Sequence, residues 1–113
     1  MLNNIELGRI GEDAAVKLLE AKGYEVLERN YRRSCGEIDI IAEKDAEISF
    51  IEVKTRRNAD YGRPCESVDY RKQRHIRDTA IFYLREDCAQ RGGYARMNFD
   101  VIEIMINHIK GSF

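Results

Sequence analysis

Three ionisable residues, Asp39, Glu52 and Lys54, lie within two apolar segments that favour β-strands. Side chains alternate between the two faces of a strand, so Phe50, Glu52 and Lys54 share one face of their segment. By the same alternation, Ile38 and Ile40 share the face opposite Asp39. Two neighbouring antiparallel strands can therefore bring Asp39, Glu52 and Lys54 to one side of a sheet. Ionised groups near a sheet core lose hydration at a cost of several kcal/mol each, which predicts a compensating cation.

Metal-assisted hydrolysis of a phosphodiester is the chemistry that these three residues support. Carboxylate oxygens are ligands that Mg²⁺ and Mn²⁺ prefer, so we expect Asp39 and Glu52 to hold the ion. The ion would polarise the phosphate and lower the pKa of a bound water. Lys54 would orient that water or stabilise charge on the phosphate. The alternative is a same-face ion pair between Glu52 and Lys54, with Asp39 as the cross-strand partner of a base.

A basic segment follows these strands. Residues 54–77 contain eight Lys or Arg and three Asp or Glu, a net charge of +5 in a chain of net charge −1. One basic face is compatible with a polyanion, although the near-neutral total argues against indiscriminate coating of nucleic acid. We expect a nucleic-acid backbone to contact Arg56, Arg57, Arg71, Lys72, Gln73 and Arg74. A solvated helix and loop is the alternative for this segment.

The hydrophobic pattern predicts the elements that position these residues. The expected helices cover residues 5–22, ended by Gly23, and 69–90, capped by Ser67 or Asp69; the expected strands cover 24–31, 37–43, 47–55 and 97–106. The strand 47–55 is apolar on both faces, which suits a central strand. The order α-β-β-β-α-β predicts an α/β fold, with a central mixed sheet flanked by helices, in a single domain over 1–113.

Other classes of protein are disfavoured. Cys35, Cys65 and Cys88 are far apart and odd in number, which argues against a disulfide framework and a zinc site. The first residues lack the basic and apolar regions of a signal peptide. No run approaches the ~20 apolar residues that cross a bilayer. We therefore expect a cytoplasmic protein without a membrane partner.

Three motifs carry a resemblance to a known family. GRIGEDAA at 8–15, GEIDIIA at 36–42 and FIEVKTR at 50–56 resemble the YraN-like family of uncharacterised bacterial proteins. Further matches extend the resemblance from about Gly8 to Ile106. That family is similar to a branch of the PD-(D/E)xK restriction-endonuclease-like superfamily, close to archaeal Holliday-junction resolvases.

The resemblance implies a restriction-endonuclease-like fold and an Mg²⁺-dependent (or Mn²⁺-dependent) nuclease acting on structured or branched DNA. It also implies a homodimer, by analogy with resolvases that cut two strands symmetrically. Residue by residue, Asp39 matches the motif's aspartate, Glu52 its second acid and Lys54 its lysine. Glu12 matches an acid on the first helix that completes the metal sphere. Ile38 departs from the pattern, because the superfamily name has proline there.

Two other functions are compatible with the same residues. A nucleic-acid-binding module with a catalytically silent site shares the basic segment and predicts salt-sensitive binding that does not need Glu52. A structural or protein-interaction domain without a nucleic-acid role is kept open by the near-neutral charge. Retention of Asp39, Glu52 and Lys54 favours the nuclease, because a silent site needs none of them.

Overall fold

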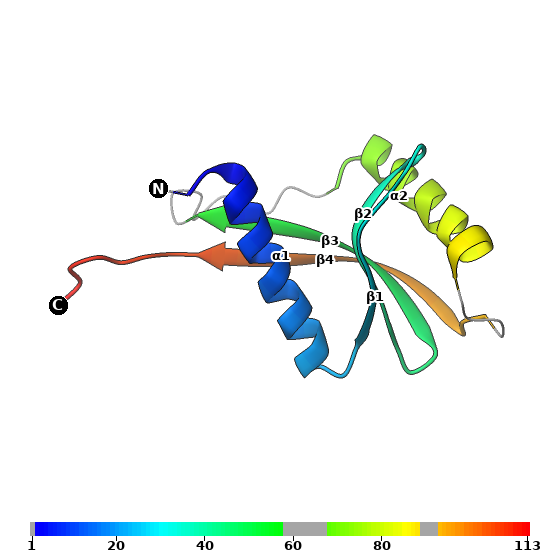
Figure 1. Ribbon diagram of the computed structural model, residues 1–113, viewed down its shortest axis with the longest axis horizontal. Helices are drawn as coiled ribbons and strands as arrows, with labels where there is room; N and C mark the ends of the chain where they lie inside the picture. The colour runs from blue at the N-terminus through cyan, green and yellow to red at the C-terminus, as the bar shows by residue number, and fades with distance from the viewer. Residues whose placement is uncertain (1, 58–67, 89–92) are drawn as a thin grey trace.

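A four-stranded sheet with a helix on each face forms the molecule, as the computed structural model shows (Figure 1). The structure describes residues 2–57, 68–88 and 93–113. In chain order the elements are α1 (Asn4–Ala21), β1 (Glu25–Arg33), β2 (Gly36–Lys44), β3 (Glu47–Arg57), α2 (Tyr70–Phe82), a π-helical turn η2 (Tyr83–Asp87) and β4 (Arg96–Ile106). The predicted α/β fold and the order of its elements are confirmed. Cys65, Ser67 and residues 58–66 of the predicted loop lie outside the described residues.

The sheet is mixed, as predicted. Its strand order is β1-β2-β3-β4; β1–β2 and β2–β3 are antiparallel, and β3–β4 is parallel along the full length of both strands. A parallel pair needs a crossover connection, and the α2 segment supplies it. β3 is central and β4 forms one edge.

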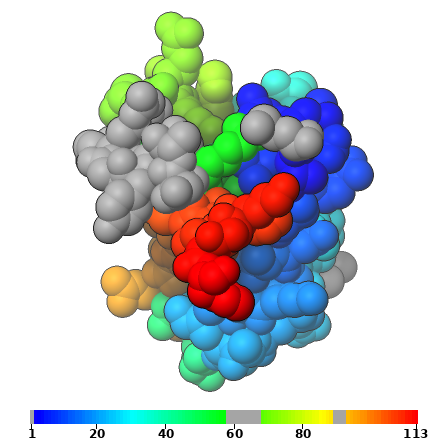
Figure 2. All heavy atoms as spheres, turned by 90° about the vertical axis from the view of Figure 1, so that its left-hand side faces the viewer, coloured from blue at the N-terminus to red at the C-terminus, as the bar shows by residue number. Residues whose placement is uncertain are grey.

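Each face of the sheet has its own hydrophobic core. On the α1 face, Ala15 and Leu19 pack with Ile40 and Ile51. On the α2 face the core contains residues of α2, its π-helical turn and the first three strands: Ile76, Ala80, Tyr83, Tyr31, Ile38, Ile41, Ile48 and Phe50. Burial on both faces explains why the β3 sequence is apolar without alternation. In Figure 2 the atoms of α1, in blue, and of α2, in light green, lie on different sides of the strand atoms in green and orange-red.

The ends of α1 are fixed by local hydrogen bonds. Asn3 caps the first turn with its side chain. At the other end Gly23 adopts φ 91°, a left-handed conformation that glycine tolerates best. Its N–H donates to the carbonyl of Glu20 (3.0 Å), and the N–H of Tyr24 donates to the carbonyl of Leu19 (2.9 Å), which together form a Schellman motif. The predicted stop at Gly23 is confirmed.

The second helix begins as predicted but ends early. Asp69 caps α2 by accepting the backbone N–H of Lys72 at 2.8 Å. The prediction of helix to residue 90 is wrong, because Cys88 is already extended. The N–H of Cys88 donates to the carbonyl of Tyr83, and this wider π-type turn lets both residues contact the core.

A close contact sets the position of α1 against β3. A Cβ atom added at Gly11 would lie 1.9 Å from Oγ1 of Thr55, so only glycine permits this approach. Gly11 is buried, and the next residue along α1 is Glu12. The contact therefore holds Glu12 beside the sheet. Neither described helix has the length and apolar character needed to cross a membrane.

Candidate active site

The strands β2 and β3 separate at the level of the predicted site. Their pairing ends at Ile40 and Ile51; beyond that point β3 continues to Arg57 paired with β4. Figure 1 shows the β1–β2 hairpin turning away towards α2. At this fork Oδ2 of Asp39 accepts the backbone N–H of Val53 at 2.8 Å. The carboxylate thus replaces a strand as the partner of that N–H and is fixed beside β3.

The fork also interrupts the alternation of side chains in β2. Ile38 belongs to the core on the α2 face, whereas Ile40 belongs to the core on the α1 face. The sequence predicted one face for both. The interruption lies opposite Asn30 of β1, which has φ 51°. As a result Asp39 lines a groove on the α1 face, and the neighbouring Glu52 lines a cavity on the α2 face.

The carboxyl groups of Asp39 and Glu52 interact at the fork. Burial raises the pKa of Asp39 to about 6, although the hydrogen bond from Val53 opposes the shift. The negative charge of Glu52 and a hydrogen bond shared with it raise this pKa further, and the charge of Glu12 adds to the effect. Two acids in this arrangement require a shared proton or a cation.

A lysine from α2 supplies one such cation. Nζ of Lys72 forms an ion pair with Oε1 of Glu52, whose side chain is 11% exposed. Burial lowers the pKa of Lys72, but the hydrogen bond and charge of Glu52 outweigh it, with help from Asp39 and Glu37, so the net pKa is raised. Lys54 makes no hydrogen bond or ion pair with any residue that the structure describes. The lysine beside Glu52 is therefore Lys72, which the sequence predicted only as a phosphate contact.

Glu12 lies near this pair but is held by other groups. Its Oε1 accepts hydrogen bonds from Nδ2 of Asn30 at 2.9 Å and from two nitrogens of Arg29 at 3.3 Å. Within 2–57, 68–88 and 93–113, no three Asp, Glu, His or Cys side chains approach closely enough to hold one ion. The structure thus brings Asp39 and Glu52 together and leaves Glu12 nearby, bonded to Arg29 and Asn30.

The donor set nevertheless fits magnesium. Mg²⁺ keeps several waters and is commonly bound through one or two carboxylates together with substrate phosphates. Asp39 and Glu52 provide two oxygen-bearing groups, and burial together with the charge of Glu52 raises the pKa of Asp39. A third protein carboxylate is not required for such a site.

A groove of about 690 Å³ surrounds Asp39 and Glu12 between α1, β1 and β3. Four arginines line it: Arg9, Arg29, Arg32 and Arg57. Sequence reasoning selected Arg57 and missed the other three, because they lie before the basic segment. The run Glu-Arg-Asn-Tyr-Arg-Arg of β1 carried a usable signal, since β1 pairs with the strand that bears Asp39.

The predicted nucleic-acid contacts on β3 have partners within the protein. Arg56 forms an ion pair with Glu103 of β4 at 3.1 Å. Arg57 donates to Oδ1 of Asn4 at 3.1 Å and to the carbonyl of Leu2 at 2.9 Å. These arginines join the end of β3 to β4 and to the N-terminal segment.

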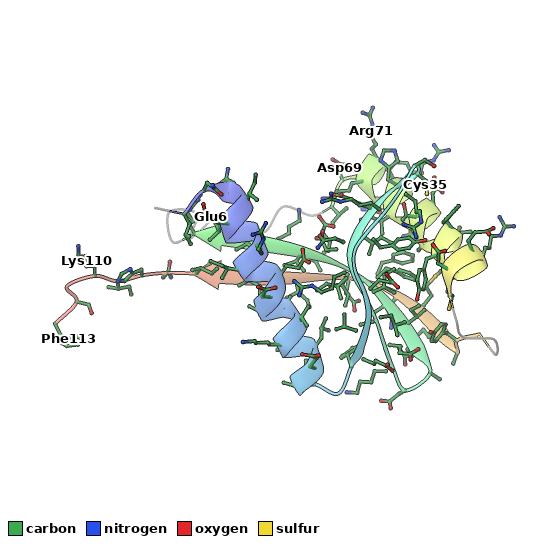
Figure 3. All side chains as sticks on the ribbon, in the orientation of Figure 1. Glu6, Cys35, Asp69, Arg71, Lys110 and Phe113 are labelled. Carbon is green, nitrogen blue, oxygen red and sulfur yellow. The ribbon has the colours of Figure 1, made fainter. Side chains whose placement is uncertain are left out.

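The residues of α2 that were predicted to contact nucleic acid differ in their surroundings. Arg71 is exposed and points away from the sheet (Figure 3). Arg74 is also exposed, while Nε2 of Gln73 donates to the carbonyl of Val68 at 2.7 Å. Of this set, Lys72 contacts the acidic pair, and Gln73 lines the same cavity as Glu52.

Comparison with known proteins identifies the family of this chain. Residues 11–104 match the profile of a family described as "Uncharacterised protein family UPF0102". The chain belongs to this family. It is 44% identical over 106 residues to a UPF0102 protein of Dictyoglomus turgidum, covering 94% of this chain and 87% of that protein. It is also 44% identical over 117 aligned residues to a UPF0102 protein of Clostridioides difficile, covering 99% and 100%. The predicted resemblance to the YraN-like family, which is UPF0102, is confirmed.

Proposed function

We propose that this UPF0102 protein is an Mg²⁺-dependent nuclease that hydrolyses phosphodiester bonds in structured or branched DNA. The observation that carries the proposal is the contact between Asp39 and Glu52 at the fork of β2 and β3. Placing two carboxyl groups side by side in a half-buried site is costly without a cation. An arginine-lined groove opens directly onto Asp39, which suits a polyanionic substrate.

Each residue at the fork has a distinct role in this proposal. Asp39 and Glu52 would hold the ion, and the hydrogen bond from Val53 keeps Asp39 oriented. When bound, the ion would supply Lewis-acid stabilisation of the phosphate and a more acidic water. Lys54, two residues beyond Glu52 on the same strand, would orient that water or stabilise charge on the phosphate. Glu12 would join the ion after release from Arg29.

The direct test measures cleavage of four-way junctions, flaps and duplexes by purified protein with Mg²⁺ or Mn²⁺. The variants Asp39→Asn, Glu52→Gln and Lys54→Met should each lower the rate by about 100-fold or more, the usual effect of removing one transition-state contact. Chelation with EDTA should abolish cleavage by the wild type. Junctions and flaps should be cut faster than linear duplex.

A matched control is available on the same strand as Asp39. Glu37 lies two residues away, pairs with Arg32 at 3.0 Å and is exposed, so Glu37→Gln should retain the wild-type rate. Equal trace cleavage by the wild type and by Glu52→Gln would show that a contaminant cuts the DNA. The claim of enzymatic activity would then fail.

A second function has its own supporting observation. Lys72 already neutralises Glu52, and Arg29 and Asn30 hold Glu12, so protein groups satisfy both acids without an ion. This arrangement suits a nucleic-acid-binding module with a silent site. That function predicts salt-sensitive DNA binding unchanged in Glu52→Gln, together with no Mn²⁺ binding by calorimetry. The nuclease predicts Mn²⁺ binding that Asp39→Asn weakens.

A further inference from the structure

The strand β4 forms a long open edge of the sheet. It pairs with β3 from Arg96 to Ile106, and no other described strand pairs with it. An edge strand presents a row of backbone N–H and C=O groups that can pair with another chain. Figure 2 shows atoms of β4, in orange to orange-red, at the surface of the molecule, with the red C-terminal residues in front of them. Among the described strands, this outer edge of β4 is therefore unpaired.

Three apolar side chains lie exposed along one face of this strand. Met97 is 42% exposed, Val101 45% and Met105 43%. They recur every fourth residue, so alternation places them on the same face as Phe99, which packs on the α2-side core. We call these three residues the β4 stripe. The stripe is symmetric: a methionine lies four residues before Val101 and another lies four residues after it.

Because the β4 stripe is symmetric about Val101, a second copy of the same strand is a matching partner. When two antiparallel copies of one strand pair about a two-fold axis at Val101, Val101 faces its own copy and Met97 faces Met105 of the other chain. Cross-strand apolar pairs of this kind are stabilising. One set of exposed residues then covers the other, as an isologous interface requires.

The charged residues of β4 are compatible with this register. Arg96 would face Ile106, Asp100 would face Ile102, and Glu103 would face Phe99 of the other copy, so no two charges meet. An axis at Asp100 instead would oppose two carboxylates, which is destabilising. An axis at Ile102 would place Val101 against Glu103. Of these three positions for the axis, only Val101 pairs the β4 stripe of one copy with the β4 stripe of the other.

We propose that β4 pairs antiparallel with β4 of a second copy of this chain, about a two-fold axis at Val101. The two sheets then form one continuous eight-stranded sheet. The register of β3 and β4 places Val101 beside Glu52, so the axis passes at the level of the candidate active site. The two Glu52 residues lie three strand spacings apart, about 14 Å, on one face of the sheet. The assembly presents two sites side by side to one substrate.

Cysteine cross-linking tests the register directly, in a background of Cys35→Ser, Cys65→Ser and Cys88→Ser. Residues opposed across an antiparallel pair have Cα atoms about 4.5–5.5 Å apart, which a disulfide can bridge. Val101→Cys should therefore give a covalent dimer in most of the protein on oxidation. Met105→Cys alone should not, since its two copies lie about 27 Å apart. Mixing Met97→Cys protein with Met105→Cys protein should restore the cross-link.

Oligomeric mass provides the second test. The wild type should show twice the chain mass of 13.2 kDa in light scattering. Val101→Lys places two ammonium groups against each other on the axis, so its mass should fall twofold while its circular dichroism is unchanged. Leu18→Lys, at an exposed apolar position on α1, should keep the dimer mass.

Defined outcomes overturn this inference. A wild-type mass of 13.2 kDa at all concentrations, no cross-link in Val101→Cys, or equal cross-linking by Met105→Cys would each do so. The inference does not rest on nuclease activity, because mass and cross-links are read without substrate. A dimer that cuts no DNA would leave it standing while the proposed nuclease fails.

Discussion

Two adjacent carboxyl groups at a strand fork have three ways to lower their repulsion: a proton, a protein cation or a metal ion. Burial, together with the charge of Glu52, raises the pKa of Asp39 to about 6 and so favours the proton; the ion pair of Lys72 with Glu52 supplies the protein cation. A divalent ion would act on both acids at once. The proton, the ammonium group of Lys72 and a metal ion compete for the same two carboxyl groups. Substituting one of these residues should therefore change the pH dependence of stability or the affinity for metal in a defined direction.

Asp39→Asn should stabilise the metal-free protein at neutral pH. The pKa of Asp39 is raised from 3.8 to about 6, so the folded state binds the proton more tightly than the unfolded state. Stability therefore falls as pH rises from about 4 to about 6 and stays low above that range. Asparagine can still accept the N–H of Val53 but carries no charge. Its melting temperature in EDTA should exceed that of the wild type at pH 8 and approach it at pH 4.

Glu37→Gln is the control for that measurement, because its exposed carboxylate lies on the same strand. It should follow the wild-type pH profile. A pH profile of Asp39→Asn that parallels the wild type between pH 4 and 8 would contradict a raised pKa at Asp39.

Lys72→Met should tighten the binding of Mn²⁺. Lys72 neutralises Glu52 in the metal-free protein, so an ion must displace its ammonium group. Methionine removes the competitor and keeps a similar length of side chain. Calorimetry should give a severalfold lower Kd for Mn²⁺, whereas Lys17→Met, at an exposed site on α1, should have no effect. Weaker binding in Lys72→Met would show that Lys72 supports the metal site.

At the scale of elements, the sequence predicted most of the strand and helix limits because hydrophobic spacing is a local property. Helix α1 and strand β4 begin and end within one residue of expectation. The interruption at Asp39 could not be predicted, because it depends on how the β1–β2 hairpin turns away from β3. The partnership of Lys72 with Glu52 was missed for a related reason: α2 reaches the fork only after the chain has folded over the sheet.

Glycines at two positions of α1 should respond in opposite ways to alanine. Gly11→Ala would bring a Cβ to 1.9 Å from Oγ1 of Thr55 and to 2.9 Å from its Cβ, so the helix must move. Such overpacking costs about 1–3 kcal/mol. Gly8→Ala meets nothing within 4 Å and should stabilise the helix by about 0.5–1 kcal/mol. Urea denaturation measures both.

The consequence of Gly11→Ala should extend to the site. Displacing α1 moves Glu12 relative to Asp39, so Gly11→Ala should change the pH profile or metal response as well as stability. If Gly11→Ala and Gly8→Ala have the same free energy of unfolding, the close approach of α1 to β3 is not maintained in solution.

At the scale of the whole molecule, a net charge of −1 conceals two separate arginine surfaces. One lines the groove at Asp39 and includes Arg9 and Arg32. The other is the exposed side of α2, with Arg71 and Arg74. The sequence predicted the second through the local density of charge. Three of the four arginines of the first surface lie on α1 and β1, which are distant from the basic segment in sequence, so the composition of that segment revealed only Arg57.

On the proposed function, the salt dependence of DNA binding should separate these two surfaces. Each phosphate contact contributes about 0.9 to the slope of log K against log salt concentration. The double variant Arg9→Ala/Arg32→Ala should reduce that slope by up to about 1.8, because both residues line the groove onto which Asp39 opens. The ion pair of Arg32 with Glu37 is exposed and worth little, so its loss should not unfold the protein.

The matched double variant Arg71→Ala/Arg74→Ala removes the same charge from α2 and should reduce the slope less. Fluorescence anisotropy with a labelled junction in EDTA measures both variants without cleavage. If only the α2 variant lowers the slope, the backbone runs over α2 and reaches the fork from the Glu52 side. If both lower it equally, the nucleic acid spans the two faces of the sheet. The slope therefore identifies the face from which a phosphate approaches Asp39 and Glu52.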